Sequence, residues 1–523
     1  MSPISSNAIL GAALLLLVSS CAAHAPVVDL GYAQYEGVVD TDLDVTKFLG
    51  IRYAAPPTGD LRWRAPTAPS KLHGIQQAAI DPPQCIQGSN FPIPTNPLIP
   101  QSEDCLFLSV YSPALNSTRP LPTIVWIHGG GYVWGSASEY NGTEIVVESN
   151  RQVVVVVIQY RLGLFGFLAG KEVKDGGAPN AGLLDQDFAL RWVNQNIRKF
   201  GGDPDKVAIW GESAGAGSVI QQVIAHNGKT EPQLFRAAIT SSTYLPPQYR
   251  YSDQVPQKLF NNISAQARCA DANALECLRA VDSTLLQEIN ENVILASFFG
   301  TTTFGPVVDG SFIAQSPTDA LEQGLVNGDI LLSVTNAHEG TIFVNQSEEF
   351  DIAQYAQQLF PLFGAKEGEA VASTYRSLGF SLEQADAIMG EALFICPTYV
   401  LLDAFRNQSY KGEYAVGSAL HGSDVFYYFP SFTFPGTELS FNNTAFIDGF
   451  ADGFLSFAVN LDPNDKLQPT VTPTWPKWSS TGAVEMVFNR TEAGDLSIVA
   501  NPTSPGLLNR CEFWKSLRNL TAQ

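Results

Sequence analysis

The strongest constraint on the fold is an alternation of apolar, strand-length runs with helical patterns between residues 123 and 242. Runs that are apolar throughout are typical of strands buried on both faces of a parallel sheet, and strand–helix alternation implies βαβ crossovers. We therefore predict an α/β fold with a large, mostly parallel central sheet flanked by helices. The expected elements are strands at Thr123–His128, Val153–Tyr160, Val207–Trp210 and Ala237–Ser242, and a helix at Asp185–Arg198.

The remaining sequence is expected to join this sheet in one domain. Residues 27–70 predict short strands and turns, and strand character returns at Ile330–Asn336 and Val425–Phe429. Residues 255–300 and 350–415 have mainly helical patterns that interrupt the sheet. No internal repeat or low-complexity linker divides the 523 residues. We expect a single domain over residues 26–523 with two helical insertions.

The N-terminal segment resembles a secretory signal peptide. The apolar run Ala8–Val18 precedes the small-residue stretch Ser19–Ala25 and is too short for a membrane-spanning helix, which needs about 20 residues. We expect cleavage within residues 22–25, although no Lys or Arg precedes the run. A buried N-terminal helix and a lipoprotein site at Cys21 are alternatives. No later run approaches 18 apolar residues, so stable membrane insertion is not expected.

Sequons and cysteines agree with export. Removal of Cys21 leaves an even number of cysteines, which in an exported chain favours disulfides. Six cysteines allow 15 pairings, of which proximity suggests Cys85–Cys105 and Cys269–Cys277, leaving Cys396–Cys511. The Asn-x-Ser/Thr sequons, of which we expect several to be glycosylated, are Asn116, Asn141, Asn262, Asn345, Asn407, Asn442, Asn489 and Asn519.

Charge and composition exclude several partners. The net charge of −21 makes nucleic acid an improbable ligand, because phosphate binding needs clustered Lys and Arg. Only 15% of residues are charged, so Ser, Thr, Asn and glycans must hydrate the surface. No Cys-x-x-Cys motif or Cys/His cluster is present, and we expect neither a metal nor a cofactor. The sequence leaves monomer and dimer equally open.

A candidate nucleophile lies in Gly211-Glu212-Ser213-Ala214-Gly215, directly after the expected strand Val207–Trp210 and at the start of a helical pattern. Gly-x-Ser-x-Gly in that context is a nucleophile elbow, a turn so tight that the flanking glycines must lack side chains. The turn holds a serine hydroxyl at a helix N-terminus, where the helix dipole favours developing negative charge. We predict that Ser213 is a catalytic nucleophile.

A serine hydroxyl needs a base, and the base needs a carboxylate that fixes its tautomer. Of the six histidines, His421 lies just before the expected strand Val425–Phe429, where a loop at the sheet end can present it to Ser213. Glu339 follows the expected strand Ile330–Asn336, at a carboxyl end where α/β sheets place their sites. The chain order Ser213, Glu339, His421 is the order of the elbow family.

Acyl transfer also needs donors for a tetrahedral oxyanion. The segment His128-Gly129-Gly130-Gly131 follows an apolar strand, and its glycines allow main-chain N–H groups to approach the oxygen closely. We predict an oxyanion hole formed by the N–H groups of Gly130, Gly131 and Ala214.

Longer motifs give the chain a specific resemblance. The segment Phe200–Gly215 and the segment Glu103–Pro113 are similar to the two signatures of the type-B carboxylesterase/lipase family, which includes secreted fungal esterases, fungal lipases and cholinesterases. GIRYAAPPTGDLRWRAP from Gly50, NAGLLDQ from Asn180 and GPVVDG from Gly305 are further typical stretches. The resemblance extends from about residue 30 to Trp514.

The resemblance implies an α/β-hydrolase fold with a helical region over the site, the triad Ser213, Glu339 and His421, and the oxyanion donors named above. It also implies disulfides at Cys85–Cys105 and Cys269–Cys277 and supports the pair Cys396–Cys511. The implied substrate is a small-molecule carboxylic ester, and the implied location is extracellular.

Departures from the family pattern shape the expected specificity. The Cys85–Cys105 loop is shorter than the flap of the fungal lipases and contains no Trp, which disfavours both a hinged lid and choline binding. We therefore expect hydrolysis of small to medium-chain soluble esters through an acyl-enzyme, with a lipase or sterol esterase as the alternative and a non-catalytic adhesion protein as a remote one. Candidate pocket residues are Tyr132, Trp134, Phe298, Phe299 and Glu212.

Overall fold

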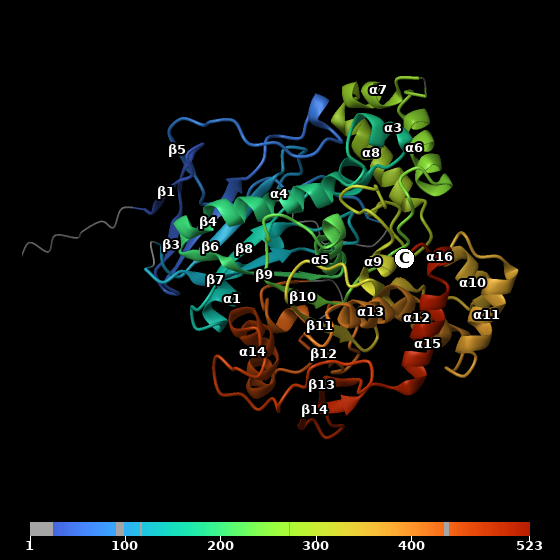
Figure 1. Cartoon of the computed structure of the whole chain (residues 1–523). Helices are drawn as coiled ribbons and strands as arrows, with labels where there is room; N and C mark the ends of the chain where they lie inside the picture. The colour runs from blue at the N-terminus through green and yellow to red at the C-terminus, as the bar shows by residue number, and fades with distance from the viewer. Residues whose placement is uncertain (1–24, 90–98, 116–117, 271, 434–438) are drawn as a thin grey trace, which may run out of the picture.

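The computed structural model describes residues 25–89, 99–115, 118–270, 272–433 and 439–523 (Figure 1). The predicted signal peptide, apart from Ala25, and the sequon at Asn116 lie outside the described residues.

A mixed sheet of 11 strands forms the centre of the molecule, in the order β14-β13-β12-β11-β10-β9-β7-β8-β6-β4-β3. The strands from β13 to β8 pair in parallel, whereas the outer pairs are antiparallel. The four predicted strands between residues 123 and 242 are β7 to β10. The strands are β3 (Val38–Asp40), β4 (Val45–Arg52), β6 (Phe107–Ser112), β7 (Leu121–Ile127), β8 (Val154–Ile158), β9 (Gly202–Glu212), β10 (Ala237–Ser241), β11 (Ile330–Asn336), β12 (Ser409–Tyr414), β13 (Val484–Arg490) and β14 (Leu496–Pro502). A separate small sheet contains β1 (Val27–Asp29), β2 (Gln34–Glu36) and β5 (Ile75–Gln77).

The central strands are buried on both faces, as their unbroken apolar runs predict. Along β8, Val154, Val156 and Ile158 join one hydrophobic cluster, while Val155 and Val157 join another. Side chains alternate between the two faces of a strand, so the two clusters are the two cores on either side of the sheet. The sheet is therefore the middle layer of three.

Helices cover both faces of the sheet (Figure 1). Residues of α4 and α5 belong to one core, and residues of α1 and α14 belong to the other. The predicted helix at Asp185–Arg198 is α4 with a short 3₁₀ extension, Ile197–Phe200. The helices of these layers are α1 (Gly142–Glu148), α2 (Gly163–Phe167), α3 (Lys171–Gly176), α4 (Ala181–Asn196), α5 (Ala214–Ile224) and α14 (Thr444–Asn460).

Two helical regions leave the sheet at the carboxyl ends of β10 and β11, and Figure 1 shows their helices gathered at one side of the molecule. The second region ends at Ala404, before β12, so the range 350–415 is helical only in its larger part. The helices of the two regions are α6 (Gln254–Gln266), α7 (Ala274–Ala280), α8 (Ser283–Leu295), α9 (Pro317–Glu322), α10 (Ile352–Leu359), α11 (Ala365–Tyr375), α12 (Ser381–Gly390) and α13 (Cys396–Ala404). Two C-terminal helices, α15 (Pro505–Ser516) and α16 (Arg518–Thr521), follow β14.

One predicted strand is wrong. Residues Val425–Tyr427 form a 3₁₀ helix rather than a strand, and their side chains are buried among aromatic residues of α14. A short apolar run reads as a buried strand or a buried helix equally well, which is why the pattern misled. The strand that presents His421 is β12, which precedes it.

Three disulfides connect the pairs that the sequence suggested: Cys85–Cys105, Cys269–Cys277 and Cys396–Cys511. The third joins the second helical region to α15, across a sequence separation of 115 residues. The C-terminal segment is thereby attached beside the carboxyl edge of the sheet.

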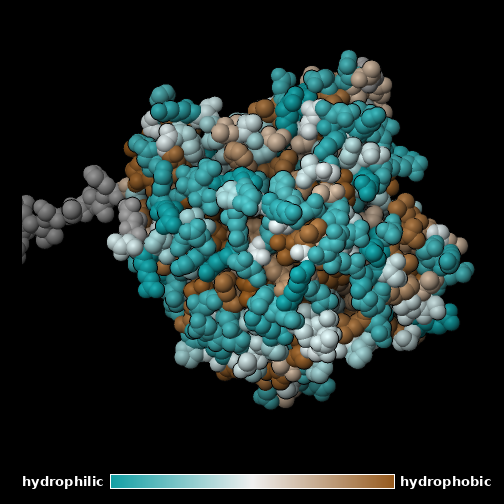
Figure 2. Space-filling model, viewed as in Figure 1, coloured by the Kyte–Doolittle hydropathy of each residue, from teal (hydrophilic) through white to brown (hydrophobic). Residues whose placement is uncertain are grey.

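One helix of the described residues, continuous from Ser381 to Ala404, is long and apolar enough to cross a membrane by length and composition. Its most apolar stretch is 78% buried inside the structure, as in the core helix of a folded domain. On the face shown in Figure 2, polar residues cover most of the surface and apolar residues are interspersed among them.

Candidate active site

Ser213 occupies the sharp turn between β9 and α5, with φ 55° and ψ −124°. A Cβ on Gly211 would lie 2.4 Å from the Gly215 carbonyl oxygen, and one on Gly215 would lie 2.0 Å from the Ile127 carbonyl oxygen. Both positions therefore require glycine, because backbone atoms stand where a side chain would begin. The turn is a nucleophile elbow that holds the Ser213 side chain at the wall of a cavity.

His421 and Glu339 meet because β11 and β12 are parallel neighbours whose chains continue side by side past the sheet. His338 and Leu420, the residues just before them, form an isolated parallel bridge. The Nδ1 atom of His421 lies 2.6 Å from the Oε2 atom of Glu339, and the Asn336 N–H donates to Glu339 Oε1 at 2.7 Å. This arrangement fixes the imidazole with Nδ1 toward the carboxylate.

The second ring nitrogen of His421, Nε2, has no hydrogen-bond partner among the described residues. Glu212 Oε1 lies 3.3 Å from it without forming a hydrogen bond. The imidazole ring is held by Phe343 and Phe394, whose ring centroids lie 4.9 and 4.7 Å away. His421 and Ser213 line the same cavity, so Nε2 is available to a hydroxyl there.

Sequence reasoning missed a second carboxyl group near the histidine. Asp424 is fully buried; it accepts hydrogen bonds from the Asn336 side chain at 2.9 Å and from the Tyr428 hydroxyl at 2.9 Å. Asn336 also donates to the Ser242 hydroxyl, which ties the turn after β10 to the turn after β11. An acid three residues after the candidate base was the available signal.

The carboxyl groups around His421 decide its protonation. Burial alone lowers the pKa of His421, but the charge and hydrogen bond of Glu339, followed by the charges of Glu212 and Asp424, outweigh burial and raise it. Burial raises the pKa of Glu212 to about 8, despite the attraction of His421. Burial also raises the pKa of Asp424.

The candidate oxyanion donors converge on the elbow. Gly130 and Gly131 have φ of 100° and 61°, a region that favours glycine, and both line the cavity beside Ser213. A Cβ on the preceding Gly129 would lie 3.1 Å from Ser213 Cβ, so the glycine loop passes directly against the nucleophile. Ala214 is the first residue of α5, where N–H groups have no partner within the helix.

His128, which begins the glycine loop, is a structural residue. It is buried, its Nδ1 lies 2.9 Å from the Gly129 carbonyl oxygen, and its ring stacks on Tyr160. Burial lowers the pKa of His128 to about 4, so the imidazole is neutral. Its contacts support the start of the glycine loop.

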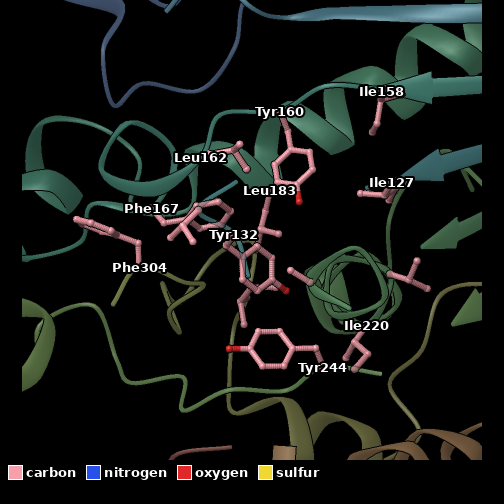
Figure 3. Packing of buried hydrophobic residues seen from close by; sticks show 14 of the residues in the cluster. Ile127, Tyr132, Ile158, Tyr160, Leu162, Phe167, Leu183, Ile220, Tyr244 and Phe304 are labelled. Carbon is pink, nitrogen blue, oxygen red and sulfur yellow. The ribbon is translucent and has the colours of Figure 1, made fainter. Parts of the chain in front are cut away.

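The predicted pocket residues lie in different places. Trp134 and Glu212 line the cavity beside Ser213. Tyr132 is fully buried and lines neither this cavity nor the next, and its ring lies between Phe167 and Tyr244 (Figure 3). Phe298 lines a second cavity, and Phe299 is 43% exposed and lines neither of the two.

Within the described residues, no three His, Cys, Asp or Glu side chains are grouped so that they could hold a metal ion. The site therefore offers a hydroxyl, an imidazole, a buried carboxylate and glycine N–H groups around one cavity of about 70 Å³. These are the groups that acyl transfer to serine needs.

Comparison with known proteins agrees with this chemistry. A sequence model of the carboxylesterase family matches residues 24–503. Lipase 2 of Geotrichum candidum is 33% identical, with 87% of this chain and 89% of the relative covered. Carboxylesterase patB of Aspergillus clavatus is 29% identical, with 97% and 99% covered. The crystal structure of Aspergillus niger EstA superposes with a TM-score of 0.85 at 31% identity, over 95% of this chain and 99% of that one.

The extent of these matches shows the fold and the class of reaction together. The mixed sheet of 11 strands, flanked by helices, is that of an α/β-hydrolase. The chain belongs to the carboxylesterase family and is a carboxylic-ester hydrolase.

Proposed function

We propose that this esterase is a secreted serine hydrolase in which Ser213, His421 and Glu339 form the catalytic triad. The observation that carries the proposal is the pair of contacts at His421: Nδ1 lies 2.6 Å from the Glu339 carboxylate, while Nε2 is without a hydrogen-bond partner among the described residues, beside the cavity that Ser213 lines. This is the polarity that a general base for serine requires.

In this mechanism, neutral His421 takes the Ser213 proton through Nε2 as the Ser213 Oγ attacks the ester carbonyl carbon. The tetrahedral oxyanion accepts hydrogen bonds from the N–H groups of Gly130, Gly131 and Ala214. His421 then donates the proton to the leaving alcohol, which leaves an acyl-enzyme on Ser213. Water activated by His421 repeats these steps and releases the acid. Glu339 stabilises the imidazolium that forms in each step.

The cavity supports a preference for small to medium-chain soluble esters. Its volume is about 70 Å³, and Trp134, Tyr140, Phe343, Phe394 and Phe432 contribute aromatic walls. Aromatic walls favour apolar groups on either side of the ester bond.

A lipase is the second candidate, because relatives named secreted lipases match this chain. The secreted triacylglycerol lipase LIP1 of Gibberella zeae is 30% identical, with 84% of this chain and 82% of the relative covered. Emulsified triglyceride separates the two candidates: a lipase accelerates sharply once the lipid interface forms, and the esterase proposed here does not.

Export is part of the proposal and rests on the predicted signal peptide within residues 1–25, the three disulfides and the names of the secreted relatives. We expect glycans first at the sequons whose asparagines are exposed: Asn262, Asn407, Asn442 and Asn519.

The test is hydrolysis of p-nitrophenyl butyrate by Ser213→Ala. We expect kcat to fall by about 10⁴- to 10⁶-fold, because the nucleophile is removed. Ser149→Ala is the matched control; it removes the hydroxyl of a buried serine at the end of α1 and should keep full turnover. A Ser213→Ala protein with turnover close to that of the control would contradict the assignment.

A further inference from the structure

The cavity beside Ser213 has a larger neighbour. The second cavity has a volume of about 290 Å³ and lies among α6, the segment 297–307 and α10. Tyr244 and Thr302 line both cavities, and they are the only residues that the two share within the described part of the chain. These two side chains therefore separate the reaction site from a space several times its size.

A hydrogen bond closes this partition. The Tyr244 hydroxyl and the Thr302 hydroxyl lie 3.2 Å apart. Burial raises the pKa of Tyr244 to about 12, so the phenol keeps its proton for this bond at neutral pH. A single hydrogen bond of this kind contributes little enough that a substrate can displace it.

Tyr244 and Thr302 each pack against a residue that lines the cavity beside Ser213. The Tyr244 ring stacks on Phe394 at 5.2 Å, and Phe394 contacts His421. A Cβ on Gly131 would lie 2.6 Å from Thr302 Cγ2, so Thr302 packs directly against an oxyanion glycine. The backbone N–H of Leu245 donates to the Leu393 carbonyl, which fixes the chain next to Tyr244. The partition thus lies against Phe394 and Gly131, which line the cavity beside Ser213.

The chemistry of the second cavity selects its ligand. No charged side chain occurs among the described residues that line it; the walls include Phe167, Leu259, Phe298, Leu359 and Leu393, with several prolines and hydroxyl groups. An aliphatic chain is the group that gains most from such a cavity, since each methylene moved out of water raises affinity by about fourfold. A charged group would lose its hydration there, and no charged side chain among the described lining residues would compensate for it.

We propose that the second cavity is an acyl-chain site, and that the hydrogen-bonded pair Tyr244 and Thr302 is a gate that sets the acyl length this esterase accepts. The inference rests on the proposed serine mechanism and adds the substrate class to it. The acyl chain, rather than the alcohol, is the occupant because it stays bonded to Ser213 through two chemical steps, whereas the alcohol departs after the first. Short acyl chains end before the gate, and longer chains must open it.

The experiment compares kcat/KM for p-nitrophenyl esters from butyrate to decanoate, below their critical micelle concentrations. Tyr244→Phe and Thr302→Val each remove the hydrogen bond with little change in shape, and each should raise the decanoate-to-butyrate ratio about two- to tenfold. Tyr244→Ala joins the cavities and should raise the ratio by more than about tenfold. Tyr355→Phe, which removes another buried tyrosine hydroxyl from α10, is the control and should leave the ratio unchanged.

Two further measurements test whether the second cavity is the space that is used and whether the acyl chain is the group that enters it. Val255→Trp fills part of the second cavity from α6 and should cancel the gain of Tyr244→Ala. Butyrate esters of longer alcohols, from ethyl to decyl, should show no comparable gain in Tyr244→Ala. An unchanged acyl ratio, a gain that Val255→Trp leaves intact, or a gain in the alcohol series would each overturn the proposal.

Titration with a fluorophosphonate separates failure of the gate from failure of the mechanism. Labelled protein with an unchanged acyl ratio refutes the gate alone, whereas protein that does not label refutes the proposed nucleophile. Rates are referred to the titrated concentration of sites, so a variant that folds incompletely still gives a valid ratio.

Discussion

Two sides of the catalytic cavity are positioned by different means. Ser213 is fixed by its immediate neighbours, since the two elbow glycines and the start of α5 all lie within a few residues of it. Phe394, which lines the same cavity and contacts His421, lies in a π-helical turn, Glu391–Ile395, that is held by residues more than 100 positions away. One side depends on local backbone geometry and the other on long-range attachments.

The attachments of the π-helical turn come mainly from the C-terminal segment. Arg510 donates to both oxygens of Glu391, at 2.6 and 2.8 Å, and the Gln523 side chain donates to the Ala392 carbonyl at 2.9 Å. The disulfide Cys396–Cys511 joins the next residue of the chain to α15. The comparison teaches that a local motif can position Ser213, whereas the cavity wall at Phe394 depends on contacts with the C-terminal segment.

The largest effect on turnover is expected at the contact between Glu339 and His421. These two residues lie 82 positions apart in the sequence. Glu339→Gln keeps the shape but removes the charge that stabilises imidazolium, so kcat should fall by about 10³- to 10⁴-fold. Steady-state hydrolysis of p-nitrophenyl butyrate measures it. A fall of less than tenfold would show that another carboxylate supports the histidine.

The next effect compares the long-range attachment with a local one. On the chain-entropy account, loss of the disulfide Cys396–Cys511 should lower the free energy of unfolding by about 5 kcal/mol, against about 2.5 kcal/mol for Cys269–Cys277, because the loops closed differ in length. Urea unfolding of the two Cys→Ser double variants gives the values. Equal losses would remove the distinction between the two regions.

A glycine substitution tests the Ser213 side of the cavity, where the elbow packs against the Ile127 carbonyl of β7. Gly215→Ala places a Cβ against the Ile127 carbonyl and should lower the free energy of unfolding by about 1–3 kcal/mol, with loss of fluorophosphonate labelling as the elbow opens. Gly482→Ala is the control, since its Cβ would meet only the Ser479 hydroxyl at 3.5 Å. An active Gly215→Ala protein with unchanged stability would refute the steric account of the elbow.

The smallest effect concerns pH. The proposed mechanism requires neutral His421, and the carboxyl groups of Glu339, Glu212 and Asp424 raise its pKa above the ordinary value of about 6.5. The acid limb of the kcat/KM profile should therefore lie above that value, with activity falling as the pH drops through it.

Asp424→Asn removes one of the charges that raise this pKa, so the acid limb should move to lower pH by a fraction of a unit. Profiles of the two proteins, recorded in the same buffers, show the displacement. A limb that moves to higher pH would contradict the assignment of His421 as the group that titrates.

The contrast between local and long-range contacts also explains which features could be predicted from the sequence. The strands β7 to β10 and the elbow could be predicted from short stretches of sequence. A strand buried on both faces is an unbroken apolar run, and a tight turn needs closely spaced glycines, so each pattern spans no more than about 10 residues. Glu339 could be predicted because it closely follows a strand of the parallel sheet. His421 was predicted from its position before an expected strand at Val425–Phe429, but that strand does not form, and His421 instead follows β12. Asp424 was missed, because its position three residues after His421 does not show that it is buried and bonded to Asn336, 88 residues earlier.

Packing between distant segments explains why other predictions were wrong. The run Val425–Phe429 is apolar enough for a strand, but α14 supplies aromatic partners that bury a 3₁₀ turn instead. Phe299 was predicted in the substrate pocket and is half exposed, whereas Phe394 and Tyr244, which line the cavity, were not singled out. The fold of the helical regions over the sheet determines which aromatic side chains face a cavity. The spacing of apolar residues along the sequence does not show this.

Peptide mapping after reaction with a fluorophosphonate tests the central claim most directly. If a hydroxyl, an imidazole and a carboxylate cooperate at this cavity, one adduct per chain forms and maps to the peptide that contains Ser213, and its formation slows in Glu339→Gln. Absence of an adduct, or an adduct on another residue, would contradict the account.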